Sequence, residues 1–293
     1  MHKAGFVNIV GNPNVGKSTL MNLLMGERIS IATFKAQTTR HRIMGILNTP
    51  EMQICFSDTP GVLKPNYKLQ EQMLQFSESA LQDADVLLYV TDMVEKPGKN
   101  ADFIAKVQKM TVPILVLINK IDLSDQKSLE QKVEEWHDLL PAAEIYPISA
   151  LHKFNVDNVL ARIKELLPES PAYFDKDQWT DKPARFFVSE IVREKILLYY
   201  DKEIPYSTEV VVEEFKETER NIRIRTVVYV ERESQKGILI GHGGVALKRM
   251  GSEARKTLEK FFGKSIFLDV YVKVDKDWRQ SEKAMRSYGY KLD

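Results

Sequence analysis

Eight residues near the start of the chain, Gly11 to Ser18, have the types and spacing that bind a chain of phosphates. They lie between an apolar run and a helical run. The two glycines let the backbone curl so that amide N–H groups point inward around a phosphate. An ordinary glycine-rich turn is the alternative. The strand–loop–helix context and the terminal Lys-Ser pair favour a nucleotide site formed by Gly11, Asn12, Asn14, Val15, Gly16, Lys17, Ser18 and Thr19.

A second loop, from Asp58 to Gly61, follows a strand-like run at residues 52–56. In enzymes with a phosphate loop, an acid at this place holds Mg²⁺, usually through water, and the glycine offers its N–H to the γ-phosphate. By itself, Asp-Thr-Pro-Gly is only a favourable turn. Its place after the phosphate loop predicts that Asp58 and the Ser18 hydroxyl hold the metal, while Lys17 reaches the terminal phosphates.

Two further loops could select a purine base. The amide of Asn119 can bond the major-groove edge of a purine, and the stem of Lys120 can lie along the base. The carboxylate of Asp122 can accept two hydrogen bonds from a guanine, a pairing that adenine cannot supply. A polar loop that only caps a strand is the alternative. The last loop would close over the guanine with a backbone amide and consists of Ser149, Ala150 and Leu151.

The elements around these loops predict how they are brought together. Continuous apolar runs at 6–10, 52–56, 86–90 and 113–118 indicate buried strands, and helical segments lie between them. This alternation predicts an α/β fold with a mostly parallel sheet, whose strand ends carry the functional loops. A chain of 293 residues favours two domains. We predict a nucleotide-binding domain at 1–173, a proline-containing linker at 174–183 and a second domain at 184–293.

Composition excludes several classes of protein. The formal net charge of +1 argues against a wholly basic nucleic-acid binder, although residues 180–293 hold 23 Lys and Arg against 19 Asp and Glu. The single cysteine, Cys55, excludes a disulfide framework. The longest apolar runs are too short to span a bilayer, so we expect a soluble, cytoplasmic protein.

The four loops, in this order, resemble the nucleotide-binding boxes of translation-factor-type GTPases. That resemblance implies that Thr39 is the switch I threonine that ligates Mg²⁺ together with Ser18 and Asp58, while spacing alone leaves Thr38 open. Val62 departs from the Ras-like pattern, because it stands where a glutamine orients the attacking water. Asn14 resembles an asparagine with which some such GTPases bind K⁺, or it is a turn residue beside Pro13. The residues assigned to catalysis are Asn14, Lys17, Thr39 and Gly61.

The second domain contains the pattern of an RNA-binding fold. A helical stretch at 184–200, alternating strands at 208–215 and 222–230, a Gly-x-x-Gly loop between two helices, and a strand at 265–274 follow one another. This α-β-β-α-α-β order resembles the KH (type II) fold, an α+β domain. Its glycine loop clamps a single-stranded backbone, whereas a plain helix–helix turn is the alternative. The residues expected at the RNA are Ile238, Ile240, Gly241, His242, Gly243, Gly244, Lys248 and Arg249.

A GTPase domain joined to a C-terminal KH domain resembles the Era GTPase family across essentially the whole chain. The resemblance implies an Mg²⁺-dependent GTPase that hydrolyses GTP to GDP and binds single-stranded 16S ribosomal RNA near its 3′ end. It also implies a role in small ribosomal subunit assembly and peripheral contact with the inner membrane. We expect the protein to be a monomer. Two alternatives remain open. One is a metabolic kinase that uses the phosphate loop, and the other is a GTPase whose second domain docks on a protein or a membrane surface.

Overall fold

The computed structural model describes residues 2–96 and 99–290, and these residues form two compact units. The first unit holds the chain up to Asp181 except residues 67–69, and the second holds 67–69 and the chain from Lys182. Among the described residues, no helix combines the length and the apolar character needed to cross a membrane. The domain limits 1–173, 174–183 and 184–293 stay a prediction, which limited proteolysis would test.

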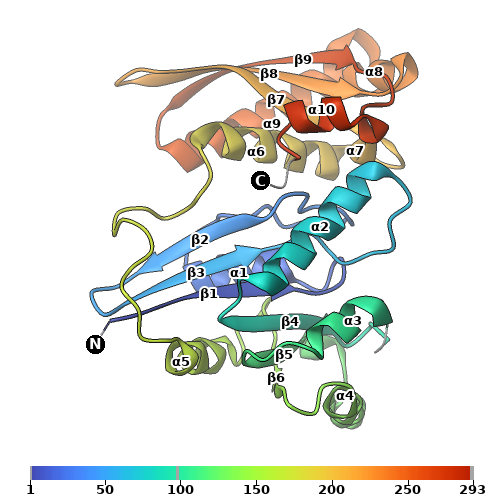
Figure 1. Cartoon of the computed structure of the whole chain (residues 1–293). Coiled ribbons are helices and arrows are strands. Elements are labelled where there is room, and N and C mark those ends of the chain that lie inside the picture. The colour runs from blue at the N-terminus through green and yellow to red at the C-terminus, as the bar shows by residue number, and fades with distance from the viewer. Residues whose placement is uncertain (1, 97–98, 291–293) are drawn as a thin grey trace. The chain divides into compact units, whose positions relative to one another are not determined.

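The first unit is built around a six-stranded sheet in the order β2-β3-β1-β4-β5-β6 (Figure 1). β2 runs antiparallel to β3, and the other neighbouring pairs are parallel. The predicted α/β fold with a mostly parallel sheet is therefore confirmed. The strands are β1 (Lys3–Val10), β2 (Ile43–Asn48), β3 (Met52–Asp58), β4 (Val86–Asp92), β5 (Ile114–Asn119) and β6 (Glu144–Pro147).

Helices flank this sheet, which explains why its central strands are continuously apolar. Every residue of β4 and β5 is buried, as expected for strands covered on both faces. The core joins Val10, Leu87 and Val116 of the sheet to Trp136 of a covering helix. The helices are α1 (Lys17–Met25), α2 (Lys68–Gln82), α3 (Ala101–Val107), α4 (Gln126–Leu139) and α5 (Val156–Leu166), with a short 3₁₀ turn, η1 (Ile121–Leu123).

The segment after α5 is attached to the first unit. The buried Gln53 of β3 accepts hydrogen bonds from the N–H groups of Tyr173 and Phe174, at 2.7 and 3.0 Å. Farther along, Ile46 of β2 donates to the carbonyl of Trp179 at 2.9 Å. β2 is the edge strand of the sheet, and the segment that contains Trp179 covers its free edge. This cover limits pairing of β2 with strands of other molecules.

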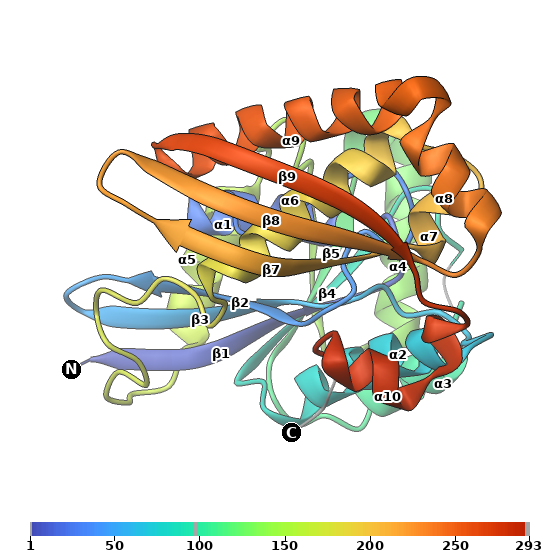
Figure 2. The same ribbon diagram turned by 90° about the horizontal axis from the view of Figure 1, so that it is seen from above.

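The second unit has a three-stranded sheet in the order β7-β8-β9, antiparallel between the first pair and parallel between the second. Its helices α6 and α9 pack against each other and against the sheet (Figure 2). The predicted α-β-β-α-α-β order is confirmed. The elements are α6 (Ala184–Tyr199), α7 (Ile204–Ser207), β7 (Glu209–Glu217), β8 (Asn221–Val230), α8 (Glu233–Ile240), η2 (His242–Gly244), α9 (Val245–Phe262), β9 (Ser265–Val274), η3 (Trp278–Gln280) and α10 (Glu282–Ser287).

Candidate functional site

The phosphate loop connects β1 to α1, and close contacts account for both of its glycines. Gly16, which precedes α1, has a φ of 99°, and a Cβ atom there would lie 2.2 Å from the side-chain nitrogen of Asn119. Gly11 has a φ of 143°, and its Cβ would lie 2.0 Å from the carbonyl oxygen of Val90. A side chain at either position would displace a neighbouring strand end. Asn14, with a φ of 66°, is the exposed member of the loop.

Lys17 is held within this loop rather than extended into solvent. Its ammonium donates to the carbonyls of Gly11 at 3.0 Å and Asn12 at 2.8 Å, and the residue is only 6% exposed. Burial lowers the pKa of Lys17 to about 8, although the carboxylates of Asp58 and Glu95 oppose this shift. A buried ammonium group that donates to backbone carbonyls is suited to an anionic ligand such as a phosphate chain.

The three predicted metal-binding side chains come from three segments and meet beside α1. The Ser18 hydroxyl donates to Asp58 Oδ2 at 2.7 Å and lies 2.9 Å from the Thr39 hydroxyl, which itself donates to Asp58 Oδ2 at 3.2 Å. Burial raises the pKa of Asp58, while the charge of Lys17 and the bound hydroxyls lower it. Asp58 Oδ1 is buried and has no hydrogen-bond partner among the described residues. This set of oxygens fits a hard cation such as Mg²⁺.

Thr38, the other switch I candidate, has a hydroxyl that contacts residues of its own loop. Its hydroxyl donates to the Lys35 carbonyl at 2.6 Å and lies 2.7 Å from the Thr33 hydroxyl. Thr39 is therefore the better placed of the two threonines for the metal, although ligation itself stays a prediction.

The turn that follows β3 is pressed against the phosphate loop. A Cβ on Gly61 would lie 2.6 Å from the Cα and N atoms of Pro13. The Val62 side chain is 2% exposed and packs in the core of the sheet, while its N–H donates to the Gly11 carbonyl at 3.1 Å. Val62 thus has its side chain turned inward, in keeping with a residue that cannot orient water, and its backbone fixes the turn.

Asn119 at the end of β5 has a bracing role that the sequence did not indicate. Its side-chain nitrogen donates to the Val15 carbonyl at 2.8 Å, and its side-chain oxygen accepts from the Ala150 N–H at 2.9 Å. The residue is 2% exposed. It therefore ties the phosphate loop to the loop at 149–151, whereas its predicted contact with a base stays a prediction.

Lys120 and Asp122 each contact a neighbouring loop of the site. The Lys120 ammonium donates to the Asn14 carbonyl at 2.6 Å and pairs with Asp92 at 2.6 Å, so its stem extends toward the phosphate loop. Asp122 accepts a hydrogen bond from the Ser149 hydroxyl at 2.5 Å. The four predicted loops are thus joined by direct contacts. Of the candidates at 149–151, Ser149 and Ala150 are buried and Leu151 is 75% exposed.

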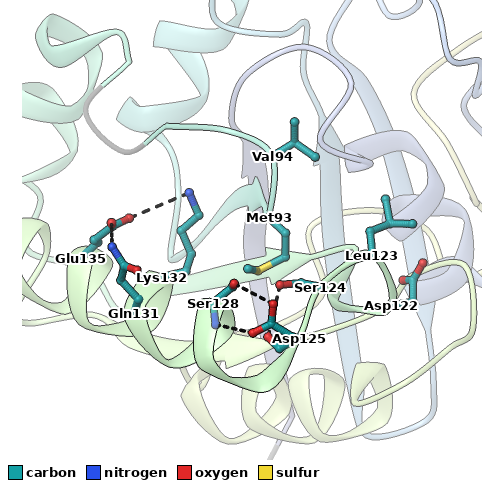
Figure 3. A pocket seen from close by; sticks show the side chains of 10 residues that line it. All are labelled: Met93, Val94, Asp122, Leu123, Ser124, Asp125, Ser128, Gln131, Lys132 and Glu135. Carbon is teal, nitrogen blue, oxygen red and sulfur yellow. Dashed lines mark hydrogen bonds and ion pairs between the residues drawn. The ribbon is translucent and has the colours of Figure 1, made fainter.

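A pocket of about 650 Å³ borders the loop that carries Asp122 (Figure 3). Asp125 begins α4 as its N-cap and accepts from the Ser128 N–H at 2.9 Å and the Ser128 hydroxyl at 3.0 Å. These bonds lower the pKa of Asp125. In Figure 3, Asp122 and Leu123 lie at one side of the pocket and Lys132 points toward Glu135 on the other. The cap fixes the end of the turn on which Asp122 lies, and so helps to hold that carboxylate in place.

A groove in the second unit is lined by one face of α9 and by β9. The helical residues recur at three- and four-residue steps, as one face requires. The lining residues are Gly244, Leu247, Lys248, Gly251, Ser252, Arg255, Leu268 and Val270. The sequence indicated Lys248 but missed Arg255, which lies two helical turns farther along the same face. Arg249 lies elsewhere, with its guanidinium 5.1 Å from the ring centre of Tyr199.

Of the other predicted RNA-binding residues, Gly244 lines this groove, and the rest precede it in the chain. Gly241, His242, Gly243 and Gly244 form the link between α8 and α9, and each of the three glycines has a positive φ. A Cβ on Gly243 would meet nothing within 4 Å, so this link is open on one side. Ile238 is 52% exposed, and Ile240 is half-buried at the end of α8.

Two protein families match the chain, one in its N-terminal part and one in its C-terminal part. The family described as a 50S ribosome-binding GTPase matches residues 6–120, and the family described as a KH domain matches residues 203–279. The GTPase Era of Staphylococcus epidermidis is 42% identical over 294 residues, covering 100% of this chain and 98% of that protein. The GTPase Era of Staphylococcus haemolyticus is 42% identical over 291 residues, covering 99% and 97%.

Solved structures agree with these matches over the full length. A crystal structure of Era in complex with MgGDPNP and nucleotides 1506–1542 of 16S ribosomal RNA superposes with a TM-score of 0.94, at 39% identity, covering 100% of both chains. A variant of Aquifex aeolicus Era in which alanine replaces one tyrosine, bound to GDP·AlF₄⁻, has the same TM-score and identity, covering 99% of this chain and 100% of that one.

Proposed function

The chain belongs to the Era family of GTPases, and from this premise we propose that it is a GTP-hydrolysing molecular switch that binds ribosomal RNA. It binds GTP with Mg²⁺ and hydrolyses it to GDP and phosphate. Its second unit binds single-stranded 16S ribosomal RNA near the 3′ end and assists the assembly of the small ribosomal subunit. The related Era structures, one with MgGDPNP and 16S RNA and one with GDP·AlF₄⁻, support both parts.

The observation that carries the GTPase part is the meeting of Ser18, Thr39 and Asp58 beside the buried Lys17. We assign Lys17 to the terminal phosphates, where its charge offsets the charge that develops during transfer. Ser18 and Thr39 hold Mg²⁺, with Asp58 beside them. When bound, the metal would supply positive charge that stabilises the charge developing on the phosphates. Gly61 offers its N–H to the γ-phosphate.

Base selection is assigned to Asp122, with Lys120 along the base and the loop of Ser149, Ala150 and Leu151 closing over it. The Asp122 carboxylate already accepts from Ser149, and it retains further lone pairs for a guanine. An adenine would leave those lone pairs unpaired in a partly closed site, which costs on the order of 1–3 kcal/mol per group. We propose that K⁺ binds at Asn14 and raises the rate of GTP hydrolysis. The Val62 side chain has no polar group to orient the attacking water, so hydrolysis needs another contribution.

The groove of the second unit is the proposed RNA site. Single-stranded RNA is recognised by exposed bases that enter a groove, while nearby cations meet the phosphates. Leu247, Leu268 and Val270 give this groove an apolar wall, and Lys248 and Arg255 add positive charge along one side. The glycine link lets the backbone of the RNA approach closely.

Two matched glycine substitutions test the RNA part. Gly243 and Gly263 both have positive φ values, 57° and 65°, and a Cβ atom at either would meet nothing within 4 Å. Gly243→Asp places a charge next to Gly244, which lines the groove, while Gly263→Asp places the same charge at the far end of α9, also at a positive φ. We expect the first to abolish binding of a fluorescent single-stranded RNA with the 16S 3′-end sequence, and the second to retain it.

Both variants should bind GTP as the wild type does, since neither changes the first unit. If Gly243→Asp binds the RNA like Gly263→Asp, the groove is not the RNA site. In that case a protein or membrane partner for the second unit becomes the better proposal.

We place the protein in the cytoplasm and propose peripheral contact with the inner membrane, as the family resemblance implies. The excess of Lys and Arg over residues 180–293 supports contact with anionic headgroups. Co-sedimentation with vesicles that contain anionic lipid, and its absence with neutral vesicles, is the expected result. A protein that sediments with neither kind of vesicle would contradict it.

A further inference from the structure

The structure places a side chain from the start of α3 between the phosphate loop and the turn after β3. Asn100 donates from its amide nitrogen to the Val62 carbonyl at 2.9 Å and to the Asn12 side-chain oxygen. Asn12 in turn donates from its own side chain to Glu95. Hydrogen bonds from Asn100 thus link Asn12 of the phosphate loop to Val62, the residue that follows Gly61.

This use of Asn100 departs from what its position favours. An asparagine just before a helix ordinarily accepts a hydrogen bond from a backbone N–H of the first turn. Here Asn100 precedes α3 with a φ of 62° and makes no side-chain capping bond. Its amide is committed to Val62 and Asn12 instead. Departures from a locally favoured hydrogen bond are expected at functional sites. The use of Asn100 for distant hydrogen bonds instead of a helix cap therefore points to a functional role.

The bond to Val62 has a consequence for Gly61. Val62, the residue after Gly61, is held on two sides: its N–H donates to the Gly11 carbonyl, and its carbonyl accepts from the Asn100 amide. Pro13 closes off a third side, since it lies within 2.6 Å of a Cβ built on Gly61. The Val62 side chain points into the core and contributes nothing to the phosphate side.

We infer that Asn100 is a positioning residue for hydrolysis: it holds the Gly61–Val62 backbone against the phosphate loop, so that the Gly61 N–H is fixed where the γ-phosphate of GTP lies. The inference rests on the proposed GTPase function and deepens it. GDP lacks the γ-phosphate, so the affinity for GDP does not depend on this N–H. Asn100 therefore contributes to the preference for GTP over GDP and to the rate of hydrolysis.

Two variants of the full-length protein separate this role from a structural one. Asn100→Gly removes the amide and tolerates the positive φ, so it adds no backbone strain. Asn100→Asp keeps the shape but cannot donate. Asn158→Gly serves as the control, because the side chain of this exposed asparagine of α5 donates to the nearby Asn155 at 2.8 Å. Affinities for GDP and for a non-hydrolysable GTP analogue are measured with Mg²⁺, together with single-turnover GTP hydrolysis.

For Asn100→Gly we expect the analogue affinity and the hydrolysis rate to fall about tenfold, as for the loss of one or two net hydrogen bonds. The GDP affinity should stay within about twofold of the wild type. For Asn100→Asp the added charge weakens both nucleotides, but the ratio of analogue to GDP affinity should fall by a similar factor. Asn158→Gly should leave the ratio unchanged.

Equal losses for GDP and the analogue would overturn the inference, because they would mean that Asn100 only supports the phosphate loop. Unchanged hydrolysis in both variants would also overturn it. The proposed function would fail differently, through a wild-type protein that does not bind or hydrolyse GTP.

Discussion

Replacing Gly16 with alanine tests whether the phosphate loop and the guanine loops are coupled through Asn119. The new Cβ would lie 2.2 Å from the Asn119 side-chain nitrogen, so the side chain must move. Movement breaks its bonds to the Val15 carbonyl and the Ala150 N–H. Each such bond contributes about 1 kcal/mol net. The two together amount to about 2 kcal/mol, which corresponds to an affinity change of about thirtyfold.

Gly26→Ala is the matched control for this change. Gly26 ends α1 with a φ of 70°, and a Cβ atom there would meet nothing within 4 Å. Both substitutions carry the strain of an alanine at positive φ, roughly 1–2 kcal/mol, but only Gly16→Ala displaces Asn119. Titration of a fluorescent GTP analogue into each variant with Mg²⁺ should give an affinity within about twofold of wild type for Gly26→Ala and about thirtyfold weaker for Gly16→Ala.

Circular dichroism of both variants checks that the fold is retained. If the two variants bind the analogue equally well, Asn119 does not couple the loops and its hydrogen bonds have no part in nucleotide binding.

Three more predictions follow from individual side chains. Burial lowers the pKa of Lys17 to about 8 in the free protein, and phosphate favours its charged form. GTP affinity should therefore be level below about pH 8 and fall by up to about tenfold per unit above it; an affinity that stays level up to pH 9 would contradict this. GTP hydrolysis should be faster in K⁺ than in matched Na⁺, and Asn14→Gly, which tolerates the φ of 66°, should remove the difference. Equal wild-type rates in both salts would exclude a K⁺ role. Lys248→Glu and Arg255→Glu should each weaken RNA binding about fivefold or more and flatten its salt dependence. Lys260→Glu on the same helix should not; a similar loss there would mean that general charge, not the groove, binds the RNA.

The sequence was sufficient to predict those strands and site residues that depend on a local pattern of residue types. Continuous apolar runs predicted β4 and β5 because both faces of these strands are covered. The phosphate-loop spacing predicted Lys17 and Ser18 because the chemistry of phosphate binding constrains residue type at each position. The resemblance to known GTPases selected Thr39 over Thr38, a choice that spacing left open.

Other features depend on contacts between residues far apart in the chain, and no local pattern indicates them. Asn100 lies 38 positions beyond the carbonyl that it binds, and an asparagine before a helix usually indicates a cap. The attachment of Trp179 to β2 was missed for the same reason, since a segment with prolines and charges resembles a free linker. Arg255 could have been found, because it repeats the helical period of Lys248.

The most direct test of the account compares GTP with ATP in the wild-type protein and in Asp122→Asn, by calorimetric titration with Mg²⁺ at fixed salt. The wild type should prefer GTP by at least about a hundredfold, because Asp122 accepts two hydrogen bonds that only guanine offers. In Asp122→Asn this preference should fall by about tenfold or more, while the fold is retained. A wild-type protein that binds ATP as tightly as GTP would contradict the assignment of these loops to a guanine nucleotide.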